Sequence, residues 1–399
     1  MASAKSLNHH HVAGTVEPGF EKVKEVFEEN FQDGWESQGA AFAAYWKGKK
    51  IIDIWGGFAD RECARPWEED TMMLAFSTSK AVCALCFAML VEKGLVSYDD
   101  LVIKYWPEYG QNGKEMTTVR MLISHQAGLP YIAGTIEIED IQDHTRMSKL
   151  LSAQKPIWEP GTKVGYHALT IGWLVDQLFR RTDSKQRGVA QFFREEIADV
   201  HGVEFFIGLP KVEQMRVARI KNTTAEEMLR EIASEPRVLM QSIDGLKPPN
   251  ESNFFRMLDQ VSILGYNFER FNDPAVRSLE IPAAGGVTTA RDLAKIFSLV
   301  EQGKLLKKEM VNVLLQPFNI EVEDNCFGIL QSSGHGFFHH MNQKGQWAMG
   351  HDGVGGQNVR LDMDNQLCFA YLTNAMKLGS DHLTGTFARI QKALYECIE

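Results

Sequence analysis

Residues 76–94 read FSTSKAVCALCFAMLVEKG, a polar start followed by the longest strictly apolar run of the chain. The run Ala81–Val91 holds no charged residue, glycine or proline, and Gly94 follows it. We therefore predict a buried helix over residues 78–93. The run is well short of the ~20 apolar residues that a membrane-spanning helix needs.

Ser77 and Lys80 lie three residues apart at the start of this helix, so their side chains share one face. A lysine at the end of a buried helix loses hydration, which lowers its pKa and frees a lone pair. A free base beside a hydroxyl is what a nucleophilic serine requires. The structural alternative is an N-cap serine with a lysine that reaches solvent. Ser152 and Lys155 repeat the spacing, and we interpret them as surface residues.

The composition is that of an ordinary globular protein. Of 399 residues, 44% are hydrophobic and 24% charged, which excludes a disordered, collagen-like or coiled-coil chain. The net charge of −10 makes nucleic acid and anionic membranes poor partners, because an acidic surface repels phosphate. The N-terminal residues lack the apolar segment of a secretory signal, and six scattered cysteines form no disulfide framework. We expect a cytoplasmic protein without membrane insertion; its oligomeric state stays open.

Four familiar catalytic motifs are missing from the sequence. It contains no G-x-S-x-G elbow, no G-x-x-x-x-G-K-[ST] loop, no H-E-x-x-H helix and no G-x-G-x-x-G fingerprint. Their absence argues against an α/β-hydrolase, a nucleotide enzyme and a zincin.

The predicted elements differ between the ends and the middle of the chain. An amphipathic helix over residues 20–31 precedes a hairpin of residues 40–46 and 51–55. Strand-like runs return near the C-terminus at residues 345–350, 356–362 and 366–373, followed by a helix over 381–396. The middle of the chain, about 105–280, holds helical patterns broken by proline and glycine turns, with little strand pattern: 117–124, 142–154, 167–181, 188–199 and 224–233.

Several segments resemble the serine β-lactamase and penicillin-binding-protein superfamily, most closely its class C-like branch, which includes family VIII carboxylesterases. They occur in the family's order over roughly residues 20–395: FSTSK at 76–80, LISHQAGLP at 122–130, EPGTKVGYHA at 159–168, GGVTTARD at 285–292 and GHDGVGG at 350–356.

The resemblance implies an α+β fold of the β-lactamase/transpeptidase type, with an antiparallel sheet flanked by helices and an inserted all-α domain. We expect residues 1–18 to be a flexible tail. Residues 19–105 and 281–399 would form a discontinuous α/β domain that carries the nucleophile and the H-x-G strand. Residues 106–280 would form a helical domain that carries the catalytic tyrosine.

Carried over by position, the resemblance implies that Ser77 is the acylated nucleophile, Lys80 its activator and Tyr166 the general base. Nearby cations would bring the pKa of a phenol down into a working range. The backbone amides of Ser77 and Val354 would form the oxyanion hole, and Gly353 would let its strand approach the substrate closely. No metal and no cofactor are implied.

Two departures from the family bear on the substrate. Ala168 stands where penicillin enzymes place an asparagine that grips an amide. The strand motif reads His351-Asp352-Gly353, so a mostly neutral histidine replaces a charged lysine and holds a substrate carboxylate less firmly. We count His351, Asp352 and Gly353 as substrate-binding residues. We expect an esterase whose substrate is a small-molecule acyl compound, namely a small or medium ester.

Other functions stay open. An acyltransferase, or a hydrolase of amides or D-peptides, would use the same apparatus, and the choice depends on water access to the acyl-enzyme. A non-catalytic scaffold that kept the fold is the alternative outside enzymology.

Several further residues have a functional and a structural interpretation, and we favour the structural one. Cys83 and Cys86 have C-x-x-C spacing but lie within the apolar helix, which favours core packing. We expect a solvated tail for His9–His11 and a hydrogen-bonding role for His125. Three histidines with spacing compatible with zinc lack an evident fourth ligand: His335, His339 and His340.

Overall fold

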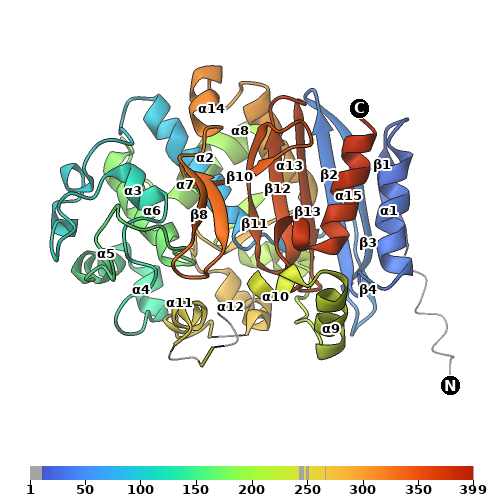
Figure 1. Cartoon of the computed structure of the whole chain (residues 1–399), viewed down its shortest axis with the longest axis horizontal. Coiled ribbons are helices and arrows are strands. Elements are labelled where there is room, and N and C mark those ends of the chain that lie inside the picture. Colours follow the sequence, from blue (N-terminus) through green and yellow to red (C-terminus); the bar gives the residue numbers. More distant parts are fainter. Residues whose placement is uncertain (1–10, 242–246, 249–250, 266, 399) are drawn as a thin grey trace.

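The fold is built on a large antiparallel sheet that lies beside a mainly helical region (Figure 1). The structure, a computed structural model, describes residues 11–241, 247–248, 251–265 and 267–398. The strands of the large sheet follow the order β1-β3-β2-β13-β12-β11-β10-β9-β8, and β4 pairs with β3. Their bounds are β1 Val12–Val16, β2 Gly39–Trp46, β3 Lys49–Asp60, β4 Arg65–Pro66, β8 Asn319–Glu323, β9 Leu330–Gly334, β10 Phe337–Met341, β11 Trp347–Gly353, β12 Gln357–Asp362 and β13 Leu367–Thr373.

Strands from the two ends of the chain meet in the middle of this sheet, where β13 pairs with β2. The predicted hairpin of β2 and β3 is confirmed. Its two-residue loop, Lys47 and Gly48, has positive φ at both positions, as the tight turns that match strand twist require. The strands predicted near the C-terminus are confirmed as β11, β12 and β13.

Helices cover both faces of the sheet. Because side chains alternate along a strand, Phe42 and Phe369 face one cluster, which packs on α1 (Glu21–Gln32) and α15 (Gly385–Glu396). The opposite face packs against α13 (Ala290–Glu301). α1 and α15 lie side by side, so the first and last helices close the same layer (Figure 1).

The N-terminal expectation is wrong in part. Residues 12–16 form β1 and pair with β3 along Val12–Val16 against Ile52–Gly56, so they are not a flexible tail. Val12 and Val16 pack against the hydrophobic cluster between the sheet and α1, which explains why this strand stays paired with β3. His9 and His10 lie outside the described residues.

The predicted buried helix is α2 (Thr78–Glu92), in which residues 78–90 are all buried. It packs on β11, α6 and α7 and so joins the sheet to the helical region. The helices in that region and around it are α3 Val119–Ile123, α4 Ile138–Gln142, α5 His144–Ala153, α6 Thr170–Thr182, α7 Val189–Phe193, α8 Asp199–His201, α9 Ala225–Ser234, α10 Arg237–Gln241, α11 Asn253–Asp259, α12 Pro274–Arg277 and α14 Lys308–Leu314.

Two groups of strands escaped prediction. A small sheet, β5-β7-β6, joins Met73–Leu74, Gly286–Thr288 and Phe205–Ile207. Strands β8, β9 and β10 form one end of the large sheet, with β8 at its edge. The boundaries of the predicted helical domain stay a prediction; one continuous hydrophobic cluster contains residues from both proposed domains.

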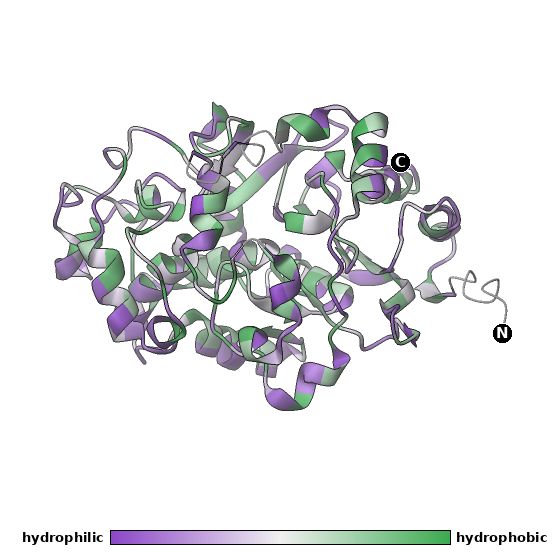
Figure 2. Ribbon diagram, turned by 90° about the horizontal axis from the view of Figure 1, so that it is seen from below, coloured by the Kyte–Doolittle hydropathy of each residue, from purple (hydrophilic) through white to green (hydrophobic). Residues whose placement is uncertain are grey.

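Hydrophobic residues are frequent along the central elements and hydrophilic residues on the outer helices and loops (Figure 2). Within the described part of the chain, no helix is both long and apolar enough to span a membrane. Ser152, expected at the surface, is buried, and its hydroxyl donates to the Lys149 carbonyl.

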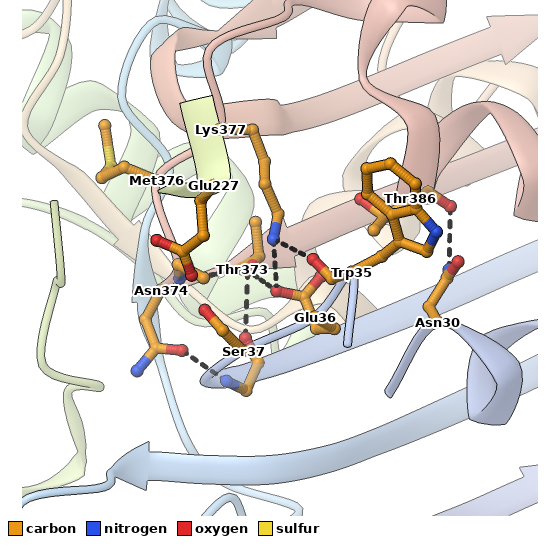
Figure 3. A network of polar contacts seen from close by, with 12 residues as sticks. Asn30, Trp35, Glu36, Ser37, Glu227, Thr373, Asn374, Met376, Lys377 and Thr386 are labelled. Carbon is orange, nitrogen blue, oxygen red and sulfur yellow. Dashed lines mark hydrogen bonds and ion pairs between the residues drawn. The ribbon is translucent and has the colours of Figure 1, made fainter. Parts of the chain in front are cut away.

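A buried ion pair fixes the loop that follows β13 (Figure 3). Lys377 Nζ lies 3.0 Å from Glu36 Oε1 and donates to the Trp35 carbonyl at 2.7 Å. The Glu36 carboxylate also accepts from the hydroxyls of Thr373 and Tyr371. A buried charge that lost these partners would be costly, so the loop beside β13 is held against the start of β2.

Candidate active site

The serine predicted as nucleophile sits at the start of α2, directly after a strained residue. Phe76 has φ +45°, a left-handed conformation that is rare for a bulky side chain. Its ring is buried edge-on against Phe268 at 5.7 Å and Phe271 at 5.5 Å between ring centroids. Such strain persists only where packing enforces it, and here it sets the turn from which Ser77 enters the helix.

Lys80 lies one turn further and is buried. Its Nζ is 3.0 Å from Ser77 Oγ and donates to the carbonyls of Ala168 at 2.8 Å and Ala283 at 2.9 Å. Burial lowers the pKa of Lys80 to about 7. A neutral amine has two hydrogens, which match the two carbonyls, and its lone pair is then left for the Ser77 hydroxyl.

Tyr166 completes the cluster that the sequence predicted. Its phenol is close enough to Ser77 for that side chain to act on its pKa, and Lys80 Nζ lies 4.8 Å from the centre of its ring. The ring contacts four other aromatic side chains: His125, Phe327, Phe338 and His351.

The expected direction of the Tyr166 pKa is wrong. Burial raises the pKa of this phenol above its usual value, and the charges of Asp352 and Asp324 act in the same direction. A positive charge on Lys80 would favour the phenolate, but the lowered pKa of Lys80, about 7, leaves that charge only partly present at neutral pH. These two directions favour a neutral Tyr166 hydroxyl and make Lys80 the better proton acceptor of the pair.

The H-x-G strand, β11, ends beside the serine. A Cβ on Gly353 would lie 2.9 Å from the Ala75 carbonyl oxygen and 3.3 Å from the Ser77 amide nitrogen, so only glycine allows this approach. Val354 follows at the turn and lines the same cavity as Ser77. Both backbone amides predicted for the oxyanion hole thus belong to segments in close contact.

His351 and Ala168 take different places around the cluster. The His351 ring is buried, stacks on Phe338 at 4.0 Å and donates from Nδ1 to the Asp352 carbonyl at 2.5 Å. Burial and the charge of Lys80 place its pKa well below the usual value. Ala168 uses its backbone, as the acceptor for Lys80. A neutral His351 cannot hold a carboxylate by charge.

Two supporting residues were missed. The Asp324 carboxylate accepts from the Tyr166 amide at 2.7 Å and fixes the tyrosine segment to the loop between β8 and β9. His167 accepts from the Leu129 amide at 2.8 Å, and its own amide donates to His125 Nδ1 at 3.0 Å. The structural role expected for His125 is confirmed. No sequence pattern marked Asp324 as the partner of Tyr166, because this contact joins residues far apart in the chain.

A cavity of about 1330 Å³ opens over these residues. Ser77 and Tyr166 lie on its wall, and the larger part of the wall is apolar, including Met228, Phe255, Leu258, Leu264, Ile320 and Leu330. The volume exceeds the ~300–1,000 Å³ typical of a small-ligand site. The cavity therefore has room for an acyl chain beyond the reacting carbonyl.

The remaining candidates have structural surroundings. Cys83 and Cys86 are buried in α2, and Cys83 Sγ contacts the Pro282 carbonyl at 3.2 Å. His335, His339 and His340 each have a separate partner: Arg120, the Leu314 carbonyl and Asp381. Among the residues that the structure describes, no three His, Cys, Asp or Glu side chains could hold a metal ion.

Comparison with known proteins adds a family match over nearly the whole chain. The family model described as Beta-lactamase matches residues 27–393. The esterase/beta-lactamase LipL of Mycobacterium tuberculosis is 32% identical over 376 residues, 92% of this chain and 83% of that protein.

Solved structures of related enzymes have the same fold. A family VIII carboxylesterase has a TM-score of 0.80 at 29% identity, covering 97% of this chain and 100% of that one. EstA from Arthrobacter nitroguajacolicus Rue61a has a TM-score of 0.81 at 27% identity, covering 96% and 99%. The predicted α+β fold and the resemblance behind it are confirmed.

Proposed function

Since the chain belongs to the beta-lactamase family, we propose that it hydrolyses carboxylic esters through an acyl-enzyme on Ser77. The protein is a serine hydrolase, as its esterase and carboxylesterase relatives indicate. The observation that carries the assignment of Ser77 is the position of Lys80, whose Nζ lies 3.0 Å from Ser77 Oγ with two carbonyl acceptors behind it.

The first half of the reaction forms the acyl-enzyme. The neutral Lys80 amine accepts the Ser77 hydroxyl proton while Oγ bonds to the ester carbonyl carbon. The carbonyl oxygen gains negative charge, which the Ser77 and Val354 amides stabilise. As the tetrahedral intermediate collapses, the ester C–O bond breaks. The leaving alkoxide takes a proton from the Tyr166 hydroxyl, which is restored by the proton held on Lys80.

The second half returns the enzyme. Water attacks the acyl carbonyl, gives its proton to the Lys80 amine, and the same amides hold the oxyanion. Collapse then breaks the bond to Ser77 Oγ, which recovers the proton from Lys80, and a carboxylic acid leaves. An alcohol in place of water would give acyl transfer, with the same bonds formed and broken.

Esters are favoured over penicillins by the surroundings of the serine. Ala168 offers no side-chain amide, and a buried His351 with a lowered pKa offers no fixed positive charge for a carboxylate. The apolar cavity wall suits a hydrocarbon chain of medium length.

We expect kcat/KM for p-nitrophenyl butyrate to exceed that for benzylpenicillin by at least about 10³-fold. The physical reason is that the penicillin carboxylate finds no cation at the site and pays for desolvation. Steady-state hydrolysis followed by absorbance measures both. Penicillin turnover at a comparable rate would overturn the preference for esters. Amides and D-peptides are the substrates to measure next in the same assay.

We also expect kcat/KM for esters to rise tenfold per pH unit below about pH 7 and to level off above it. Protonated Lys80 cannot accept the serine proton, and its pKa of about 7 places the change there. A series of initial rates from pH 5.5 to 9, corrected for hydrolysis without enzyme, gives the profile. A flat or falling profile would show that Lys80 is not the base.

A further inference from the structure

Asp352 stands out on the cavity wall because one of its carboxylate oxygens, Oδ1, has no hydrogen-bond donor among the described residues. It is the middle residue of the H-x-G segment, next to Gly353, which lies against the Ser77 amide. It lines the cavity together with Ser77 and Tyr166. Within the described chain, its buried Oδ1 accepts no hydrogen bond. An acceptor left without a donor at a buried position costs about 1–3 kcal/mol.

A neighbouring histidine on the wall adds a second free acceptor. His340 donates from Nδ1 to Asp381 Oδ2 at 2.9 Å, because a carboxylate can only accept. In its neutral form, the other ring nitrogen of His340, Nε2, is then an acceptor, and this atom is buried without a partner in the part of the chain described. With a neutral His340 ring, Asp352 Oδ1 and His340 Nε2 are thus both acceptors without a donor in the described chain.

The cations around the cavity are already paired. Arg360, which is buried and does not line the cavity, is bonded through Nη2 to Asp381 Oδ1. Lys377, the one lysine or arginine on the wall as far as the chain is described, is paired with Glu36. Lys80 carries little charge above pH 7. The negative charge of Asp352 is thus not balanced by a dedicated partner.

We propose that Asp352 determines specificity, binding a positively charged group of the substrate, so that the preferred substrates are esters that carry an ammonium group near the scissile carbonyl. This inference rests on the proposed esterase function. His340 Nε2 supplies a second acceptor for an ammonium N–H. The same charge repels carboxylates, which adds to the poor fit of penicillins.

The raised pKa of Asp352 means that a cation beside it is needed to favour its charged form. Burial and the charge of Asp381 raise the pKa of Asp352, whereas the charge of Arg360 lowers it. A carboxylate in such a place is stabilised by a cation that arrives with the substrate, since the attraction is stronger where water is excluded.

Two sets of nearly isosteric esters test the proposal. On the acyl side, these are β-alanine methyl ester, methyl butyrate and monomethyl succinate, which end in an ammonium, a methyl and a carboxylate. On the alcohol side, they are butyrylcholine and 3,3-dimethylbutyl butyrate. A pH-stat at pH 7.5 gives kcat/KM for each. We expect the cation to be preferred over the methyl compound at least about tenfold in one set, with succinate the poorest of the acyl series.

In Asp352→Asn, the ratio of kcat/KM for the cationic ester to kcat/KM for the neutral ester should fall about tenfold, to a value close to one. The matched control is Glu321→Gln, which removes an equal charge from the exposed β8 side of the wall and should keep the ratio. Ratios near one in both sets for the natural sequence, or a preference that survives Asp352→Asn, would overturn the proposal. An equal loss in Glu321→Gln would do the same, since it would show a general charge effect.

A binding measurement keeps this test independent of turnover. Calorimetry on Ser77→Ala compares β-alanine methyl ester with methyl butyrate, and we expect the cation to bind at least about tenfold more tightly. Equal binding would overturn the role of Asp352 even if ester hydrolysis is confirmed. Absence of ester turnover in the natural sequence would instead contradict the proposed function.

Discussion

Replacement of Ser77 by alanine is expected to reduce turnover of p-nitrophenyl butyrate by at least about 10⁴-fold. The acyl-enzyme bond is made to Ser77 Oγ, and no other serine has a neutralised lysine 3.0 Å away among the hydrogen bonds of the described residues. Loss of a covalent nucleophile removes the pathway itself and leaves only the residual rate increase that binding and the oxyanion hole supply. Burst and steady-state kinetics with the aryl ester measure the loss.

The fold should survive this change. The alanine removes one hydroxyl and leaves the contacts of Lys80 with the carbonyls of Ala168 and Ala283. We expect the melting temperature to stay within a few degrees. Ser79→Ala is the matched control, because Ser79 Oγ is also buried and accepts from the Gly286 amide at 3.1 Å. Turnover that persists in Ser77→Ala, or an equal loss in Ser79→Ala, would show that the wrong serine was assigned.

Lys80→Met is expected to lower kcat/KM for the same ester by about 10³-fold. Methionine keeps an unbranched side chain of similar length in the buried position but cannot accept a proton, so the Ser77 hydroxyl loses its base. The group that accepts the proton is Lys80 because its pKa is lowered to about 7 while burial raises that of Tyr166.

Stability must be followed alongside this rate. The carbonyls of Ala168 and Ala283 lose their donor in Lys80→Met, at a cost of about 1–3 kcal/mol each. Thermal melts separate unfolding from a chemical defect. Tyr166→Phe keeps the lysine and should cost about 10²-fold, the usual value for one proton-transfer group. A larger loss in Tyr166→Phe than in Lys80→Met would mean that the tyrosine is the base.

The sequence predicted the centre of the fold and of the site because both depend on local patterns. An unbroken apolar run marked α2, and strand-like runs separated by a polar turn marked β12 and β13. The spacing of Ser77 and Lys80 places their side chains on one helical turn, as the 3.0 Å contact now requires. The position of Tyr166 came from resemblance alone, since its contact with Ser77 spans 89 positions of the chain.

The features that were missed depend on tertiary contacts. β1 is held by pairing with β3 and by the cluster under α1, neither of which shows in its own residues VAGTV. Strands β8, β9 and β10 mix polar, charged and aromatic residues, so neither of the usual strand patterns appears in them.

The direction of the Tyr166 pKa could not be obtained from a motif, because burial by Phe327 and Phe338 outweighs the nearby amine. The unpaired carboxylate of Asp352 is similar. Its identity is plain in the motif, but its lack of a partner depends on Arg360 being held by Asp381.

The central claim is that Ser77 is an activated nucleophile, and the mass of the intact protein after treatment with a fluorophosphonate tests it most directly. We expect one adduct on the natural sequence, lost in Ser77→Ala and retained in Ser79→Ala. An adduct that survives in Ser77→Ala would contradict the claim by placing the reactive serine elsewhere. No adduct on a folded protein that also fails to hydrolyse p-nitrophenyl butyrate would contradict catalysis itself and favour a scaffold that kept the fold.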